Sequence, residues 1–199
     1  MKNIVPAVIV IAMILGGLIN GALDGDKFLG RVFWAVAGLA MLVILVRGYL
    51  TGSAIDRLDS SSGRHTVRAH ILLHIVPLTY FPVAYALDTD KVLAALYLIP
   101  VMIFFVSGVR TWRLCHETFG NRLYKMFQIG NRQMLLLFPV AIAVDMAGWP
   151  VEGAGLFSRL MHVYFIIHFM LTGITVPLMD RDLRRYTDNP SVSGSDARA

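Results

Sequence analysis

The chain has 199 residues, of which 56% are hydrophobic and only 16% are charged, and its formal net charge is +5. Charged residues normally make up about a quarter of a soluble domain, and here the apolar residues also come in long blocks. We therefore expect a membrane protein built from helices. The basic residues stand beside the apolar blocks, as orientation signals do, so we expect no nucleic acid partner. The single cysteine, Cys115, excludes an internal disulfide framework.

Six segments are long and apolar enough to cross a bilayer, which takes about 20 mostly apolar residues per helix. They cover residues 4–23, 28–50, 67–87, 92–112, 134–149 and 156–179. We therefore predict an all-α, polytopic bundle of six transmembrane helices within residues 1–182, followed by a disordered cytosolic tail at 183–199. The first segment, which follows Lys2, could instead be a signal peptide, but no clear cleavage site follows it.

The segments that connect these helices differ strongly in charge. With six spans, both termini and the connections at 51–66 and 113–133 lie on one side, and most of the 18 basic residues lie there too. The outward connections are short and acidic. The positive-inside rule then places the basic side in the cytoplasm. We expect a multi-pass protein of the cell (inner) membrane with both termini cytoplasmic.

Four histidines fall inside the predicted spans. Ionisable residues at membrane depth are costly, and by default they indicate a functional site. His70 and His74 share one face of the third span, with His70 at the cytosolic interface and His74 about one turn deeper. In the sixth span, His162 falls near the outer side and His168 near the middle of the bilayer.

Further polar residues accompany His168. Tyr164, His168 and Thr172 follow at intervals of four positions, so we expect this stripe to face the bundle interior. Asp145, near the outer end of the fifth span, lies at a depth similar to that of His162, and a contact between the two is geometrically allowed. The alternative is that Asp145 is hydrated among the lipid headgroups.

These residues predict a redox or proton-handling protein. A haem of the b type needs one histidine on each of two helices at matching depth, and His74 with His168 is the preferred axial pair. His70 and His162 are reserves, and Gly108 and Gly173 could let a macrocycle approach a helix. The iron would be the only metal. A quinone or another subunit of a membrane complex would then exchange electrons with the protein, which would act as an oxidoreductase component.

Three alternatives stay open. A small-solute or ion transporter or channel would use Tyr164, His168, Thr172 and Asp145 as a polar path. An accessory subunit would use its polar groups to hold helices against a partner in a larger complex. The histidines could also be purely structural, each satisfied by a backbone carbonyl. No catalytic motif is present in the sequence.

Overall fold

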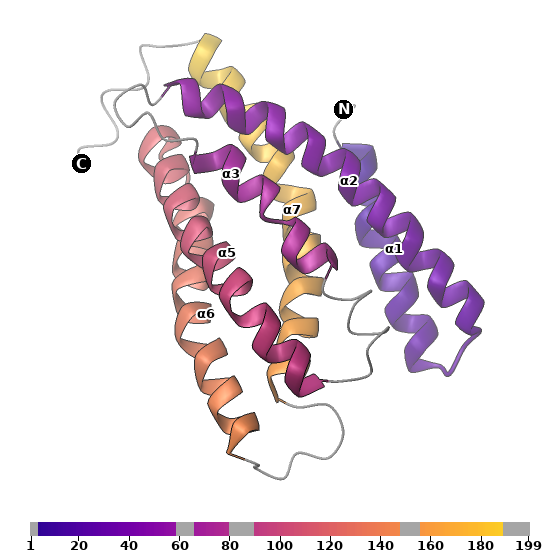
Figure 1. Cartoon of the computed structure of the whole chain (residues 1–199). Coiled ribbons are helices and arrows are strands. Elements are labelled where there is room, and N and C mark those ends of the chain that lie inside the picture. The colour runs from indigo at the N-terminus through magenta and orange to yellow at the C-terminus, as the bar shows by residue number, and fades with distance from the viewer. Residues whose placement is uncertain (1–3, 59–65, 80–89, 148–155, 189–199) are drawn as a thin grey trace.

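The protein is described by a computed structural model that covers residues 4–58, 66–79, 90–147 and 156–188 (Figure 1). Of these residues 94% are helical and none forms a strand, which confirms the all-α prediction. The labelled helices are α1 (Ile4–Ala22), α2 (Lys27–Leu58), α3 (Thr66–Leu72), α5 (Asp90–Phe119), α6 (Arg122–Met146) and α7 (Leu156–Asp188). The chain runs up and down the bundle, so the start of α3 and the ends of α2, α5 and α7 lie at one end (Figure 1).

Four of the described helices are long and apolar enough to cross a membrane. These spans are Lys27–Leu58, Leu96–Phe119, Arg122–Met146 and Val163–Asp188, and Val5–Asn20 is a shorter apolar helix. Many large apolar side chains on them are exposed, among them Leu136 at 75% and Leu39 at 66%. Soluble monomers rarely expose such large contiguous apolar surfaces. The fold is therefore compatible with a multi-pass membrane protein. Part of the predicted third span, residues 80–87, lies outside the described residues.

Several helices extend beyond the predicted spans, because a helix does not have to end where the apolar residues end. The largest difference is at α6, which begins at Arg122 and not near residue 134. Gly120 adopts a φ of +69°, which glycine tolerates without strain, and the side chain of Asn121 accepts the Leu123 backbone N–H as an N-cap. The two residues form a tight turn between α5 and α6, so the basic segment around residues 122–133 is helical.

The C-terminal boundary also differs from the prediction. The tail was expected to be disordered from residue 183, but α7 continues to Asp188. Arg184 pairs with Asp180 one turn earlier at 3.1 Å, and Thr187 donates to the Leu183 carbonyl. These contacts between successive turns favour helix over coil. Residues 189–199 of the predicted tail lie outside the described residues.

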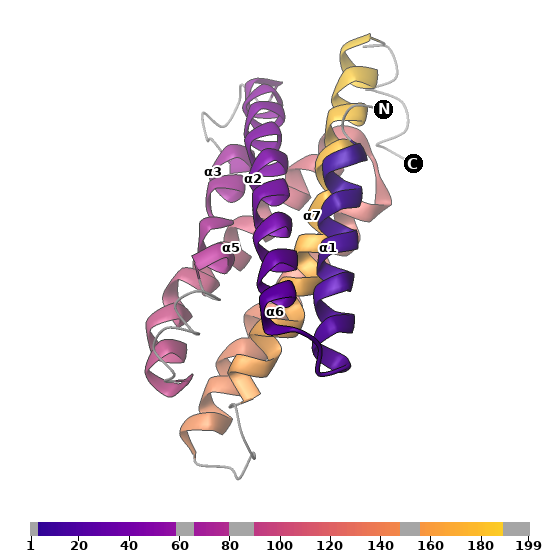
Figure 2. The same ribbon diagram turned by 90° about the vertical axis from the view of Figure 1, so that its right-hand side faces the viewer.

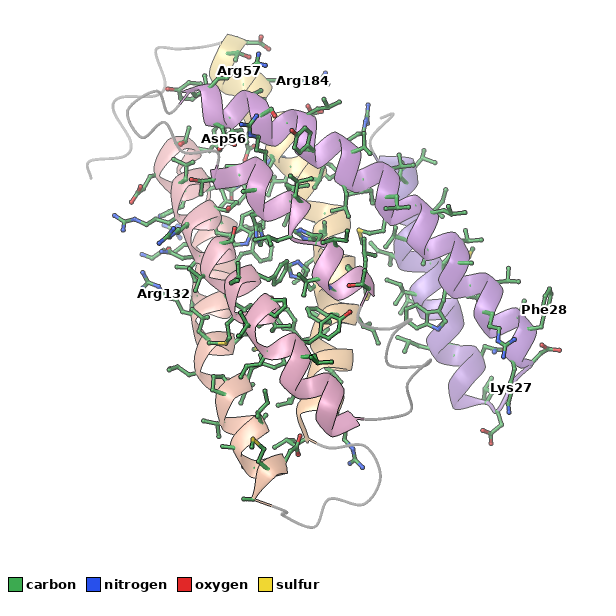
Figure 3. All side chains as sticks on the ribbon, viewed as in Figure 1. Lys27, Phe28, Asp56, Arg57, Arg132 and Arg184 are labelled. Atoms are coloured by element: carbon green, nitrogen blue, oxygen red, sulfur yellow. The ribbon has the colours of Figure 1, made fainter. Side chains whose placement is uncertain are left out.

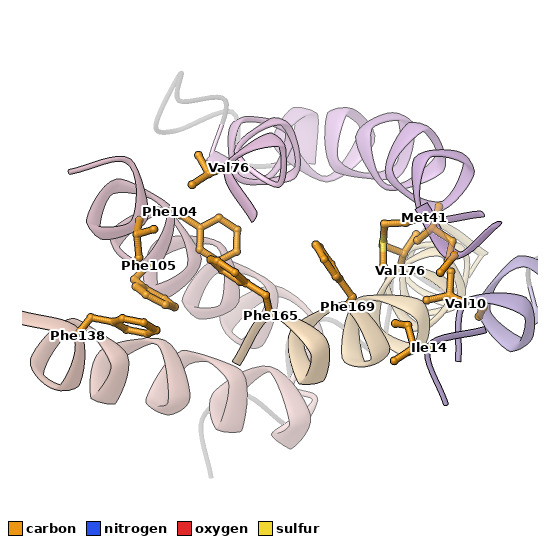
Figure 4. Packing of buried hydrophobic residues seen from close by; sticks show 14 of the residues in the cluster. Val10, Ile14, Met41, Val76, Phe104, Phe105, Phe138, Phe165, Phe169 and Val176 are labelled. Atoms are coloured by element: carbon orange, nitrogen blue, oxygen red, sulfur yellow. The ribbon is translucent and has the colours of Figure 1, made fainter. Parts of the chain in front are cut away.

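The core is rich in aromatic side chains contributed by the long helices (Figure 4). Phe104, Phe105, Phe138 and Phe165 are each fully buried, and Phe105 stacks on Phe138 with ring centroids 5.1 Å apart. Aromatic pairs of this kind contribute about 0.5–1.5 kcal/mol beyond the burial of their area. Figure 2 shows α1 beside α2 and α7, and Figure 1 shows it on the side of the bundle opposite α6. The aromatic cluster therefore lies between α5, α6 and α7, and α3 covers it from the side.

The beginning of α3 is fixed by a carboxylate of α2. Asp56 lies near the C-terminal end of α2 (Figure 3) and accepts the backbone N–H groups of Val67 at 2.9 Å and Arg68 at 3.1 Å. The first N–H groups of a helix have no partner within the helix, and a negative charge there also complements the helix dipole. Asp56 therefore sets where α3 begins, and with it the position of the histidines that follow.

Candidate functional site

The chain around His74 departs from regular α-helix. Pro77 has no N–H to donate to the Leu73 carbonyl, and that carbonyl instead accepts from Val76 at 3.0 Å. The His74 N–H likewise bonds to Ile71, three residues back, at 3.2 Å. A regular helix would use the His70 carbonyl for this bond. The carbonyl oxygen of His70 is therefore available to the His74 side chain, whose Nδ1 lies 3.0 Å from it.

His74 and His168 meet in the interior of the bundle, as the sequence suggested they could. Their Nε2 atoms are 3.0 Å apart, and the ring centroids are 5.0 Å apart. His74 is 1% exposed and His168 is 7% exposed. The two residues are 94 positions apart in the sequence. His74 comes before α5 and α6 along the chain, and His168 comes after them. Only the packing of α7 against the α3 region brings them together.

For two neutral rings, the hydrogen-bond partners decide which nitrogen of each carries the proton. The His70 carbonyl only accepts, so His74 donates from Nδ1 and its Nε2 is an acceptor. His168 must then donate from Nε2 to His74, which leaves its own Nδ1 as an acceptor. The Tyr164 hydroxyl, 3.3 Å away, donates to this Nδ1. The result is a continuous hydrogen-bonded chain, with every group neutral, from Tyr164 through His168 and His74 to the His70 carbonyl.

The walls around this chain are closely packed. The Phe104 ring stands edge-on to both imidazoles, with centroid distances of 5.2 Å to His74 and 5.0 Å to His168. Tyr164 stacks on His168 at 5.5 Å with an interplanar angle of 20°. Thr172 donates to the His168 carbonyl at 2.8 Å, and its hydroxyl lies 3.5 Å from His74 Nε2. The histidine pair is thus held in one orientation by side chains from α5 and α7.

His70 is buried inside the bundle, and its exposed fraction is 0%. Its ring lies 5.1 Å from that of His74 and 5.0 Å from that of Phe104. Its depth at the cytosolic interface stays a prediction. Depth along a helix axis does not say which face another helix covers, so the sequence did not indicate this burial. Among the described residues, neither ring nitrogen of His70 has a hydrogen-bond partner.

The space beside His70 is filled by Asn131 of α6, which reaches across Gly108 of α5. A Cβ on Gly108 would overlap the Asn131 Oδ1 atom and lie 3.2 Å from the His70 Cε1 atom. The Asn131 Nδ2 group donates to the Phe127 carbonyl at 2.8 Å, so the amide orientation is fixed. Gly108 therefore serves the close packing of α3, α5 and α6 around His70. Gly173 lies against Ala7 of α1, so neither glycine faces a space between the two imidazoles.

We predict that Gly108→Ala destabilises the protein by about 1–3 kcal/mol, the usual cost of forcing extra volume into a packed core. The added methyl group would overlap the Asn131 amide, which cannot turn away without losing its bond to Phe127. Thermal unfolding in detergent measures the effect. The double variant Gly108→Ala/Asn131→Ala should recover most of the loss. A double variant as unstable as the single one would show that Asn131 is not what fills this space.

The remaining predicted site residues are placed apart from this cluster. Asp145 accepts the Leu156 N–H at 2.7 Å, and so it caps the beginning of α7. No described contact joins Asp145 to the histidine pair. His162 belongs to α7, but its side chain lies outside the described residues, so the Asp145–His162 contact stays a prediction. Tyr164 and Thr172 do lie beside His168, on the stripe that the spacing indicated.

The site residues that the sequence did not predict lie beside the histidines and belong to other helices. Phe104 and Asn131 carry no recognisable motif, and nothing in the sequence distinguishes them from other core residues. Pro77 was visible, but the shift of the His74 N–H to the Ile71 carbonyl was not. The signals available in the sequence were the spacing of His70, His74 and Pro77 and the stripe of Tyr164, His168 and Thr172.

The geometry around His74 and His168 can be compared with what a metal ion and a haem each require. Within the described ranges, no group of three or more His, Cys, Asp or Glu side chains is arranged to hold a metal ion. An iron between the two Nε2 atoms would need them about 4 Å apart, twice a metal–imidazole bond of about 2 Å, and the observed distance is 3.0 Å. Phe104 and Thr172 also stand where the macrocycle would lie. As packed here, the residues do not fit a haem.

Comparisons with protein-family models, with curated proteins and with solved structures give no match to this chain.

Proposed function

We propose that this protein is a proton-handling membrane protein whose working site is the His74–His168 pair. The observation that carries the proposal is the 3.0 Å contact between the two Nε2 atoms inside a buried hydrogen-bonded chain. Histidine is the side chain whose proton affinity is closest to neutral pH, and it can gain and lose protons at two separate nitrogens. Two imidazoles that share a hydrogen bond away from bulk solvent can pass a proton between helices.

The direction of the hydrogen bonds supports a simple transfer step. When the Tyr164 hydroxyl gives its proton to His168 Nδ1, His168 releases the proton on Nε2 to His74. His168 ends neutral, and His74 becomes an imidazolium whose Nδ1–H still donates to the His70 carbonyl. The step leaves Tyr164 as a phenolate and His168 protonated on Nδ1 instead of Nε2. Before a second transfer, Tyr164 must take up a proton, His74 must release one to an acceptor, and His168 must return to its first tautomer.

The proposal includes the predicted topology. The protein crosses the cell (inner) membrane six times, and both of its termini lie in the cytoplasm. The support for this topology is the charge distribution. Arg57 and Arg184 lie at the end of the bundle opposite Lys27 (Figure 3), and most of the basic residues fall in the termini and connections that the sequence assigns to one side. In this orientation α7 runs from the outside inward, so His168 lies at membrane depth with Tyr164 on its outer side.

A second candidate is electron transfer through a b-type haem held by His74 and His168, with a quinone or another membrane subunit as its partner. Its support is the sequence pattern of one histidine on each of two helices; the 3.0 Å between the two Nε2 atoms is too short for an iron between them. Binding would require Phe104 and Thr172 to move apart. An absorption spectrum of protein purified from haem-replete cells tests this candidate, since a haem protein shows a Soret band and His168→Ala should remove it.

The proton-handling proposal is tested in vesicles that contain a pH-sensitive dye and the full-length protein. A potassium diffusion potential should drive proton entry well above the rate of empty vesicles. His74→Gln should return the rate to that of empty vesicles, because an amide cannot accept and release a proton near neutral pH. His116→Gln is the matched control: His116 lies at the turn between α5 and α6, where its Nδ1 contacts the Asn121 carbonyl.

The control variant should keep the full proton flux. Equal rates for the native protein and for empty vesicles would contradict the proposal. So would a His74→Gln variant that folds, as judged by thermal unfolding, and conducts protons like the native protein.

A further inference from the structure

A cavity of about 160 Å³ opens between α1, α2 and α7, away from the histidine pair. It lies near the end of the bundle where Arg57 and Arg184 are found (Figure 3). Its lining includes Arg47 and Thr51 of α2, Asp180 and Arg184 of α7, and an apolar floor formed in part by Ile44 and Val176. We propose that this cavity binds the phosphate headgroup of an anionic phospholipid.

The charges of the lining favour one negative group. Arg47 and Arg184 are cationic, and Asp180 pairs with Arg184 at 3.1 Å, so the lining carries one net positive charge. A phosphodiester carries one negative charge, which matches this excess. A guanidinium binds two phosphate oxygens at once through its planar set of N–H groups, and this geometry is why arginine is common at phosphate sites. The Thr51 hydroxyl adds a neutral donor to the cavity.

The surface next to the cavity is apolar, which favours a lipid over free phosphate as the ligand. Leu39, Val43, Val46 and Leu50 of α2 are spaced at i, i+4, i+7 and i+11, and each is between 51% and 66% exposed. Residues at this spacing form one stripe along a helix. Leu50 also lines the cavity. An acyl chain can therefore lie along α2 while its headgroup reaches Arg47, as basic pockets between transmembrane helices bind anionic lipids on the cytoplasmic side.

The test compares lipids that differ only in their headgroup. The full-length protein in a neutral detergent is titrated with phosphatidylglycerol, with phosphatidylcholine of the same acyl chains, and with inorganic phosphate. Thermal unfolding and native mass spectrometry are the readouts. Phosphatidylglycerol should raise the unfolding temperature and remain bound in the mass spectrum, and the other two should do neither. A ligand that binds only the folded state raises its stability, and the gain grows with the logarithm of the ligand concentration above Kd.

The variants locate the binding. Arg47→Gln should weaken phosphatidylglycerol binding by about tenfold, the loss expected for one charged hydrogen-bonding group. Arg47→Lys keeps the positive charge but lacks the planar guanidinium, so its affinity for phosphatidylglycerol should be intermediate. This variant shows whether the loss in Arg47→Gln comes from misfolding. Arg57→Gln is the matched control, since Arg57 is exposed near the same end of α2 and does not line the cavity.

Three results would overturn the proposal. One is equal stabilisation by the two lipids, and another is the same effect from inorganic phosphate alone. The third is an Arg57→Gln variant that loses as much affinity as Arg47→Gln, which would show that general surface charge and not the cavity attracts the lipid.

Discussion

His168→Phe should abolish proton flux and also destabilise the protein by about 1–3 kcal/mol, the cost of leaving a buried polar group without a partner. Phenylalanine can keep the stack on Tyr164, but it can neither donate to His74 Nε2 nor accept from the Tyr164 hydroxyl. Both groups would remain buried without these bonds. Vesicle flux measures the first effect, and unfolding in mixed micelles measures the second.

A double-mutant cycle isolates the contact between the two histidines. His74→Phe and His168→Phe are measured alone and together, and their coupling should fall at about 0.5–3 kcal/mol, as for other buried pairs in contact. The double variant should be more stable than the sum of the single losses predicts, because it leaves no imidazole facing an apolar ring. Strict additivity would show that the two rings do not interact in the folded protein.

Asp182→Ala should be the most destabilising single change at the other end of α7, by about 2–4 kcal/mol. Its carboxylate is 9% exposed and accepts from the Tyr124 hydroxyl and the Asn121 side chain, each at 3.0 Å. Arg181 donates to its second oxygen at 3.1 Å. Without the Asp182 carboxylate, the hydroxyl of the fully buried Tyr124 loses its partner. Asn121, the N-cap of α6, also loses its link to α7. Thermal unfolding in detergent measures the loss.

Two variants test whether the cause is this network. Tyr124→Phe should cost less than Asp182→Ala, because the carboxylate keeps Asn121 and Arg181. Glu117→Ala removes an acid from an exposed pair with Arg113 on α5, and should cost less than about 1 kcal/mol. If Glu117→Ala and Asp182→Ala were equally destabilising, burial and hydrogen bonding would not explain the role of Asp182.

The histidine site was partly predictable from the sequence. The cost of ionisable groups among apolar residues singled out His74 and His168, and helical rise placed them at comparable depth. The same reasoning gave a depth for His70 but did not indicate that its ring is buried among Phe104, Trp112 and His74. Depth is a property of one helix, but burial depends on the side chains that neighbouring helices bring to each face.

The long apolar segments by themselves determined that the protein is helical and which parts of it are apolar, because backbone hydrogen bonding and helix period depend on local residues. They did not determine where helices end: the Asn121 cap and the pairing along α7 extended two of them. The tertiary structure alone decided that Asn131 fills the space at Gly108 and that α7 brings His168 to His74, whose own N–H bonds to Ile71 and leaves the His70 carbonyl to its side chain. These contacts depend on the rotation and approach of helices distant in sequence, which no local pattern specifies.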